Sequence, residues 1–271
     1  MELNYQCFPD DFLALSVSER KQSNINIPII IIPGLFGSIA NWRGFAKRLA
    51  EFYPIIVLDL RNHGGSPHVS SHSYIDMVND LDEFVKQHQL ESITVCGHSM
   101  GGKVAMLFAL LHPEKVEKLA VLDIAPVEYT HSHAPFLQEL NRVDLSQLQS
   151  RRDADALLAK VIPDTGTRLF LLQNLAGTSG CFHWRINVPV LLEFMPQIVG
   201  FPNEEIAGVS CLCQTIFILG GQSDYVKPHD YDRIGEIFKN VGFRKIDNAG
   251  HWVHADKPNE LYEVLIEFLK K

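Results

Sequence analysis

Gly97-His98-Ser99-Met100-Gly101-Gly102 lies between a strand-like run and a helix-like run. Residues 92–96 read SITVC, and residues 103–111 read KVAMLFALL. A G-x-S-x-G pattern at a strand-to-helix turn is typical of a nucleophilic serine held on a sharp turn. Its glycines leave room for the turn, so we expect Ser99 to have a strained backbone and an exposed hydroxyl. The start of the following helix favours negative charge that develops nearby.

Similar apolar runs recur along the chain and alternate with helical periodicity. Because these runs are continuous rather than alternating, they indicate strands covered on both faces, and hence a mostly parallel sheet. The runs are residues 27–32, 55–58, 119–122 and 216–219. Ser73 and Asp76 form a capping box before one predicted helix, and Pro258 begins the last one.

The order of these elements predicts an α/β fold with a doubly wound sheet of about seven or eight strands. Residues 3–17 are expected to add one or two antiparallel strands, and 243–246 an edge strand. No buried-strand run occurs between Pro126 and Ser210, where helical pieces and aromatic residues prevail. We therefore predict one core domain, residues 1–125 and 211–271, with a helical cap insertion at 126–210 over the carboxyl edge of the sheet, where ligands bind in such folds.

Composition limits the partners of this chain. Its 271 residues are 46% hydrophobic and 21% charged, as in an ordinary globular protein, and carry a formal net charge of −8. This charge argues against nucleic acid or an anionic membrane as the main partner. No phosphate-binding loop, dinucleotide fingerprint or metal-ligand constellation is found, so we expect no metal and no cofactor.

The expected location is the cytoplasm. The N-terminus lacks the basic start and apolar stretch of a signal peptide, and the apolar runs are too short to insert across a membrane. The five cysteines form no recognisable disulfide or zinc pattern and are interpreted as core thiols in a reducing compartment. A monomer and a homodimer are both compatible with the sequence.

A serine hydroxyl becomes a good nucleophile only when a base removes its proton, and a carboxylate must orient that base. In folds that carry this turn the chain order is serine, acid, histidine, which leaves His229, His251 and His254. His251 lies between the last predicted strand and the last helix, and we predict it to be the base. His254 is interpreted as a surface or supporting residue. His98 is expected to pack structurally, with its ring pointing away from the Ser99 side chain.

Two aspartates compete for the role of the acid. Asp224 follows the strand that ends at Leu219, which is the usual acid position of such a fold, and Asp123 ends the preceding strand. Both would emerge at the catalytic edge of the sheet, and spacing alone does not decide between them.

An oxyanion requires two backbone N–H donors. The first should be Met100, and the second should come from the glycine-containing loop after the strand that ends at Ile32, with Leu35 preferred over Phe36. For the substrate pocket we predict four aromatic residues: Phe36, Phe136, Phe182 and Trp184.

Four motifs together carry a family resemblance: GLFGS at 34–38, GHSMGG at 97–102, DIAP at 123–126 and GHWVHA at 250–255. The chain resembles the α/β-hydrolase superfamily, and within it the YbfF-type esterases and the abhydrolase-domain-containing protein 11 group. The resemblance implies Ser99 as nucleophile, His251 as base, Leu35 and Met100 as oxyanion donors, and Asp123 rather than Asp224 as acid. Pro33 stands where most members have a histidine that braces the oxyanion loop, so this loop must be braced differently.

The resemblance also implies a function. We expect a serine carboxylesterase that hydrolyses short- to medium-chain acyl esters of small molecules through an acyl-enzyme. An acyl-thioesterase, or a lactone or C–C bond hydrolase, would use the same residues, because fold and triad do not separate these reactions. A ligand-sensing protein with slow turnover is the alternative outside enzymes.

Overall fold

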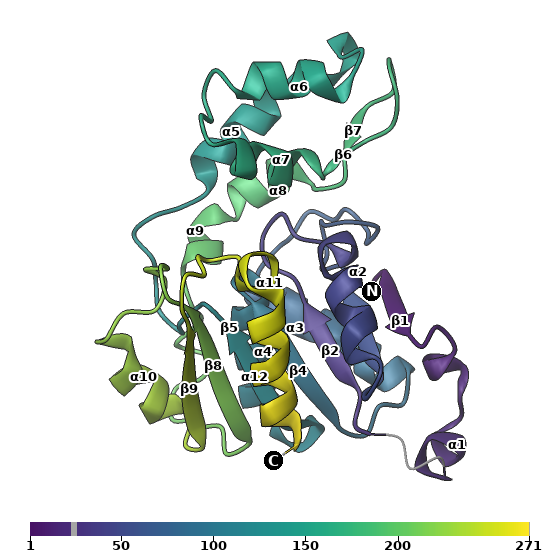
Figure 1. Ribbon diagram of the computed structural model, residues 1–271, viewed down its shortest axis with the longest axis vertical. Helices are drawn as coiled ribbons and strands as arrows, with labels where there is room; N and C mark the ends of the chain where they lie inside the picture. The colour runs from purple at the N-terminus through teal and green to yellow at the C-terminus, as the bar shows by residue number, and fades with distance from the viewer. Residues whose placement is uncertain (23–25, 271) are drawn as a thin grey trace.

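The computed structural model describes residues 1–22 and 26–270 and contains a seven-stranded sheet, in the order β1-β3-β2-β4-β5-β8-β9. β1 runs antiparallel to β3, and every other neighbouring pair is parallel. This is an α/β-hydrolase fold, and the prediction of a mostly parallel, doubly wound sheet is confirmed (Figure 1). The strands are Tyr5–Phe8 (β1), Ile29–Ile32 (β2), Ile55–Leu58 (β3), Ile93–His98 (β4), Val116–Leu122 (β5), Gln214–Gly220 (β8) and Val241–Ile246 (β9).

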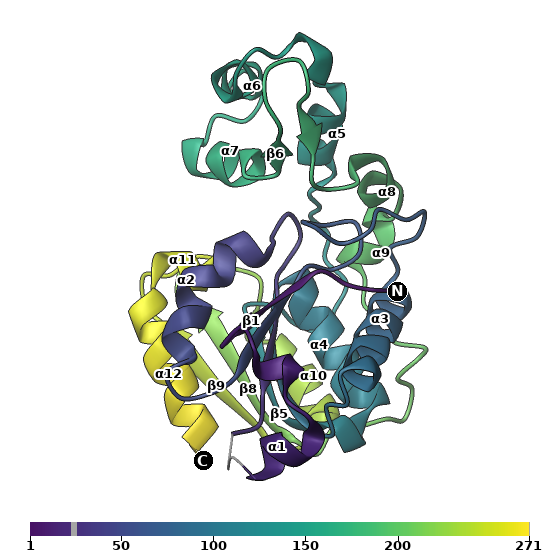
Figure 2. The ribbon, with the colours of Figure 1, turned by 90° about the vertical axis from the view of Figure 1, so that its right-hand side faces the viewer.

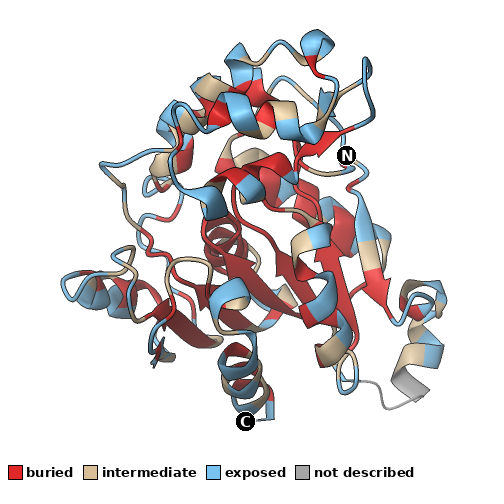
Figure 3. Cartoon of the chain, turned by 45° about the horizontal axis from the view of Figure 1, so that its top comes forward, coloured by how far each residue is buried: buried red, intermediate tan, exposed pale blue. Residues whose placement is uncertain are grey.

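The central strands are buried on both faces because helices cover both. All four residues of β2 and of β3 are buried, as the continuous apolar runs predict (Figure 3). α2 (Ile39–Leu49), α11 (Val253–Asp256) and α12 (Pro258–Lys270) pack on one face, and α3 (Tyr74–Gln87), α4 (Met100–Leu111) and α10 (Asp230–Ile237) on the other (Figure 2). Parallel strands thereby gain a core on each side.

Three local predictions agree with the structure. Ser73 and Asp76 form the reciprocal capping box of α3, and β9 is the edge strand that was expected at 243–246. Residues 3–17 supply only one antiparallel strand, β1. A 3-10 turn (Phe12–Ala14) follows it, and α1 (Val17–Gln22) then begins, because residues 9–16 leave the edge of the sheet.

The elements between Pro126 and Ser210 lie together beyond the carboxyl edge of the sheet (Figures 1 and 2). They include five helices: Ala134–Arg142 (α5), Arg151–Leu158 (α6), Thr165–Leu172 (α7), Val188–Glu193 (α8) and Met195–Val199 (α9). A short hairpin of β6 (Leu175–Ala176) and β7 (His183–Trp184) was not expected from the sequence. We refer to residues 126–210 as the proposed cap.

Candidate active site

The nucleophilic turn has the predicted strained geometry. Ser99 joins β4 to α4 with φ 52° and ψ −123°, which is rare for a residue with a side chain. A Cβ atom at Gly97 would lie 2.3 Å from the carbonyl oxygen of Gly101, and one at Gly101 would lie 2.3 Å from that of Ile32. Because these clashes are with backbone atoms that cannot move aside, only glycine fits at both positions.

Three loops bring Ser99, His251 and Asp123 into one hydrogen-bonded chain. His251 Nε2 lies 2.9 Å from Ser99 Oγ, and His251 Nδ1 lies 2.8 Å from Asp123 Oδ2. Asp123 directly follows β5, and His251 lies between β9 and α11. The arrangement is that of a nucleophile, its base and the carboxylate that orients the base.

The Asp123 carboxylate is buried and fully engaged. Besides His251 it accepts hydrogen bonds from the backbone N–H of Gly220, at 2.9 Å, and from the hydroxyl of Ser223. Burial raises its pKa to about 6, while the bonds from Ser223 and Gly220 act in the opposite direction. The carboxylate is therefore ionised at neutral pH and can hold the proton of His251 Nδ1 in place.

Asp224 is not brought to the imidazole. Its side chain is exposed, and the partner of His251 Nδ1 is Asp123. The neighbouring Ser223 points inward instead and bonds Asp123. The geometry therefore favours Asp123 over Asp224 as the acid, because the loop after β8 turns Asp224 outward.

His251 is neutral at physiological pH, as a base must be. Burial lowers its pKa to about 3, with His133 and His131 adding to the effect. His98 Nε2 lies 2.8 Å from the backbone carbonyl oxygen of His251, so His98 supports the loop that carries the base, beyond the packing role expected of it. His254 stacks on Trp42 with ring centroids 4.1 Å apart and meets the ring of His98 edge-on at 5.0 Å.

The loop after β2 approaches Ser99 closely. Leu35 lines the two cavities that reach Ser99, and Phe36 has a positive φ of 66°. Asn174 of the proposed cap donates its side-chain N–H to the Phe36 carbonyl oxygen at 2.9 Å. This bond braces the loop that Pro33 leaves without a histidine. Met100 begins α4, so its amide has no acceptor within the helix.

Two cavities flank Ser99. One extends over Ile124, Met195 and Ile198 toward Lys103, and the other is largely aromatic. Phe36 and Phe136 line the second cavity as predicted, together with Phe170 and Trp252, which the sequence analysis missed.

Phe182 and Trp184, which were also predicted for the pocket, lie away from both of these cavities. They lie at the β6–β7 hairpin and pack against the hydrophobic core, and neither lines a cavity that reaches Ser99. Their aromatic character alone could not distinguish core packing from pocket lining.

Lys103 links the core to both connections of the proposed cap. Its ammonium group is buried and donates to the carbonyl oxygens of Val127 and Val199, each at 2.9 Å, and of Gly200, at 2.5 Å. Residue 127 lies where the chain leaves the core, and residues 199–200 lie where it returns. One side chain of α4 thus joins the start of the proposed cap to the end of its last helix, α9.

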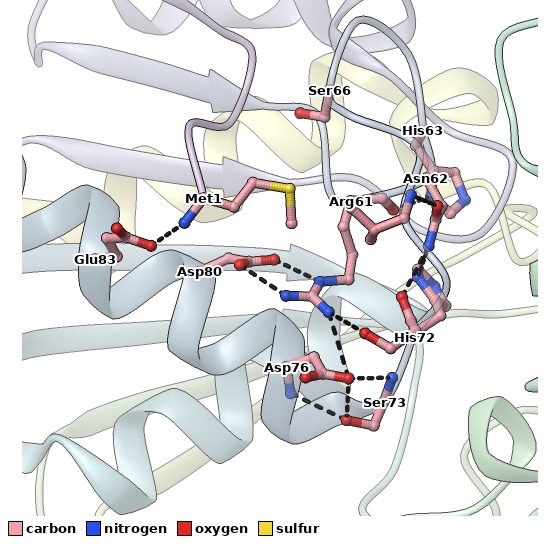
Figure 4. A network of polar contacts seen from close by, with 12 residues as sticks. Met1, Arg61, Asn62, His63, Ser66, His72, Ser73, Asp76, Asp80 and Glu83 are labelled. Atoms are coloured by element: carbon pink, nitrogen blue, oxygen red, sulfur yellow. Dashed lines mark hydrogen bonds and ion pairs between the residues drawn. The ribbon is translucent and has the colours of Figure 1, made fainter.

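Asp59 and Arg61, which follow β3, have structural roles. Asp59 Oδ1 accepts the backbone N–H of Ile39 at 2.8 Å and fixes the start of α2. Arg61 forms two hydrogen bonds to Asp80 on α3, at 2.6 and 2.8 Å (Figure 4). Neither residue lines a cavity that reaches Ser99.

Within residues 1–22 and 26–270, no cluster of three or more His, Cys, Asp or Glu side chains could hold a metal ion. None of the helices described in this structure is both long and apolar enough to cross a lipid bilayer.

Residues 27–183 match the family described as the alpha/beta hydrolase fold. The chain belongs to the α/β-hydrolase family. It is 39% identical to the sn-1-specific diacylglycerol lipase ABHD11 of Mus musculus, over 89% of this chain and 80% of the mouse protein. It is 36% identical to esterase YbfF of Escherichia coli K12, over 95% of this chain and 98% of the bacterial protein.

A solved structure described as a marine microorganism esterase superposes on this hydrolase with a TM-score of 0.88. It shares 35% identity, and the match covers 99% of each chain. Relatives named esterase or lipase therefore share both the sequence and the fold. The resemblance stated from the four motifs is confirmed, and the chain is a hydrolase whose relatives indicate small-molecule ester substrates.

Proposed function

We propose that this α/β-hydrolase is a serine carboxylesterase that cleaves short- to medium-chain acyl esters through an acyl-enzyme. The observation that carries the proposal is the single imidazole of His251, which bridges the Ser99 hydroxyl and the Asp123 carboxylate. Relatives named esterase and lipase support it. The apolar and aromatic lining of both cavities fits uncharged acyl and alcohol groups.

In the proposed reaction, His251 Nε2 takes the proton of Ser99 while the oxygen of Ser99 attacks the ester carbonyl carbon. The Met100 and Leu35 amides stabilise the negative oxygen of the tetrahedral intermediate. His251 then gives its proton to the departing alcohol, and an acyl group remains on Ser99. A water molecule, deprotonated by His251, repeats the attack and releases the acid and the free enzyme.

Asp123 keeps the proton of the imidazole on Nδ1, so that Nε2 faces Ser99 as the acceptor. It also stabilises the imidazolium that forms during each step. The role depends on the carboxylate being ionised and buried beside the ring, which the hydrogen bonds from Gly220 and Ser223 favour.

The direct test is Ser99→Ala, assayed against the unchanged protein on a nitrophenyl ester series of increasing acyl length. We expect kcat to fall by at least about 10⁴-fold while the folded structure, followed by circular dichroism, is retained. Full activity in this variant would exclude Ser99 as the nucleophile. Matched esters, thioesters and lactones in the same assay compare the proposed reaction with its alternatives.

For location we propose the cytoplasm, with the free state of all five cysteines in support.

A further inference from the structure

The ring of Tyr225 lies flat against the imidazole of His251. The two ring centroids are 3.7 Å apart and the rings are inclined by 14°. Tyr225 belongs to the loop after β8, next to Ser223, whose hydroxyl bonds Asp123. The reaction described above gives this stacked ring no role.

Tyr225 is held at both its backbone and its hydroxyl. Its N–H donates to Ser223 Oγ at 3.3 Å, and its carbonyl oxygen accepts the hydroxyl of Tyr129 at 2.8 Å. Its own hydroxyl lies 3.2 Å from His133 Nε2. Fixed in this way, the ring forms a rigid wall along one face of the imidazole.

His133 comes from the proposed cap, immediately before α5. Its ring stacks on Phe136 with centroids 5.9 Å apart and meets Phe36 edge-on at 5.8 Å. His133 also lines both cavities that reach Ser99, as Leu35 does. The hydroxyl of Tyr225 is thus bonded to the part of the cap that covers the nucleophile.

We propose that Tyr225 is a positioning residue for His251, and that its bond to His133 makes the alignment of the imidazole depend on a seated cap. The inference rests on the proposed esterase function. Two hydrogen bonds lie in the plane of the imidazole, to Ser99 and Asp123, and they leave the ring free to tilt about the line that joins them. The flat face of Tyr225 removes this freedom. An aromatic face also favours the imidazolium that forms in the transition state, because its π electrons attract a cation.

Three variants separate the ring of Tyr225 from its hydroxyl. Tyr225→Leu removes the stacked face and should lower kcat about 10- to 100-fold with little change in KM, because a misaligned base is costly. Tyr225→Phe keeps the stacked aromatic face and should retain most of the activity, with kcat about 3-fold below that of the unchanged protein. His133→Phe should lower kcat by the same factor as Tyr225→Phe. A protein that carries both substitutions should lose no more activity than either single variant, because all three lack the same hydrogen bond.

Asn187→Ala is the matched control. The Asn187 side-chain amide donates to Asn62 Oδ1 at 3.0 Å. This hydrogen bond also joins the proposed cap to the core, but neither residue lines a cavity at Ser99. We expect its kcat to remain unchanged. Thermal unfolding of every variant shows whether each one folds.

Several outcomes would overturn the inference. One is a folded Tyr225→Leu protein with kcat within about twofold of the starting value, or one in which only KM rises. Additive losses in the double variant, or a loss in Asn187→Ala equal to that in His133→Phe, would remove the link to the cap. All of these outcomes presuppose that the unchanged protein hydrolyses ester. If the unchanged protein shows no turnover, or if Ser99→Ala is active, the esterase function itself is refuted instead.

Discussion

His98 Nε2 lies 2.8 Å from the backbone carbonyl oxygen of His251. Because a carbonyl oxygen can only accept, His98 carries its proton on Nε2 and donates it. Burial lowers the pKa of His98 to about 3, so the ring is neutral. The last residue of β4, directly before Ser99, therefore fixes the backbone of the loop that carries His251.

His98→Phe is expected to lower kcat about 10-fold with a smaller effect on KM, because the His251 loop loses its anchor and a buried carbonyl loses its donor. His98→Gln, whose amide can still donate, should retain more activity. Steady-state kinetics on one nitrophenyl ester measure both. Equal kcat values in His98→Phe and the unchanged protein would show that the bond has no part in alignment.

Asp123→Asn should reduce kcat by about 10³- to 10⁴-fold, because an amide at this position favours the wrong imidazole tautomer. Asp224→Asn should stay within about threefold of the unchanged protein, because Asp224 is exposed and makes no hydrogen bond to His251. The two variants are assayed side by side on the same ester. A larger loss in Asp224→Asn would reverse the assignment of the acid.

The pH profile should have its acidic limb below the pKa of a free imidazole. The reaction needs Asp123 ionised and His251 neutral, and burial sets their pKa values at about 6 and about 3, respectively. We therefore expect kcat/KM to stay level from neutral pH down to about pH 6. Near pH 6 the Asp123–His251 pair takes up its first proton, and kcat/KM then falls. Initial rates over this range test the prediction, which an acidic limb above about pH 7 would contradict.

Lys103→Met should destabilise the fold. The carbonyl oxygens of Val127 and Gly200 would lose the Lys103 donor, whereas that of Val199 keeps the backbone N–H of Tyr129. Leaving a buried acceptor unsatisfied typically costs about 1–3 kcal/mol, and these partly buried ones should lie toward the lower end. Chemical denaturation followed by tryptophan fluorescence measures the change in the free energy of unfolding.

Lys86→Met is the control for this substitution, because Lys86 lies on the exposed side of α3 and its surface ion pair with Asp82 contributes little. If both variants unfold at the same denaturant concentration, the contacts of Lys103 do not stabilise the cap connections.

The sequence predicted the parts of the site that depend on local pattern. A strand, a tight glycine turn and a helix are visible in the residues around Ser99. The position of His251 follows from its place between the last strand and the last helix. These features need no knowledge of distant contacts.

The choice between Asp123 and Asp224 depends on tertiary structure. Both follow neighbouring parallel strands, and the outcome is decided by the direction of two loops, one of which holds Asp123 at a φ of 50°. Part of the pocket depends on how the short cap helices pack, so the sequence could not separate Phe170 from Phe182 and Trp184. Trp252 lies outside the proposed cap, and its place directly after His251 was the signal that could have identified it.

The proposed cap, residues 126–210, lies in the chain between β5 and β8, and these two strands are hydrogen-bonded neighbours from Lys118 to Leu122 of β5. Its two attachment points are therefore set by the sheet, whatever lies between them. A different segment could be grafted across the same pair of strands without disturbing the order of the sheet. Substrate range in this scaffold can thus diversify by exchange of one continuous segment.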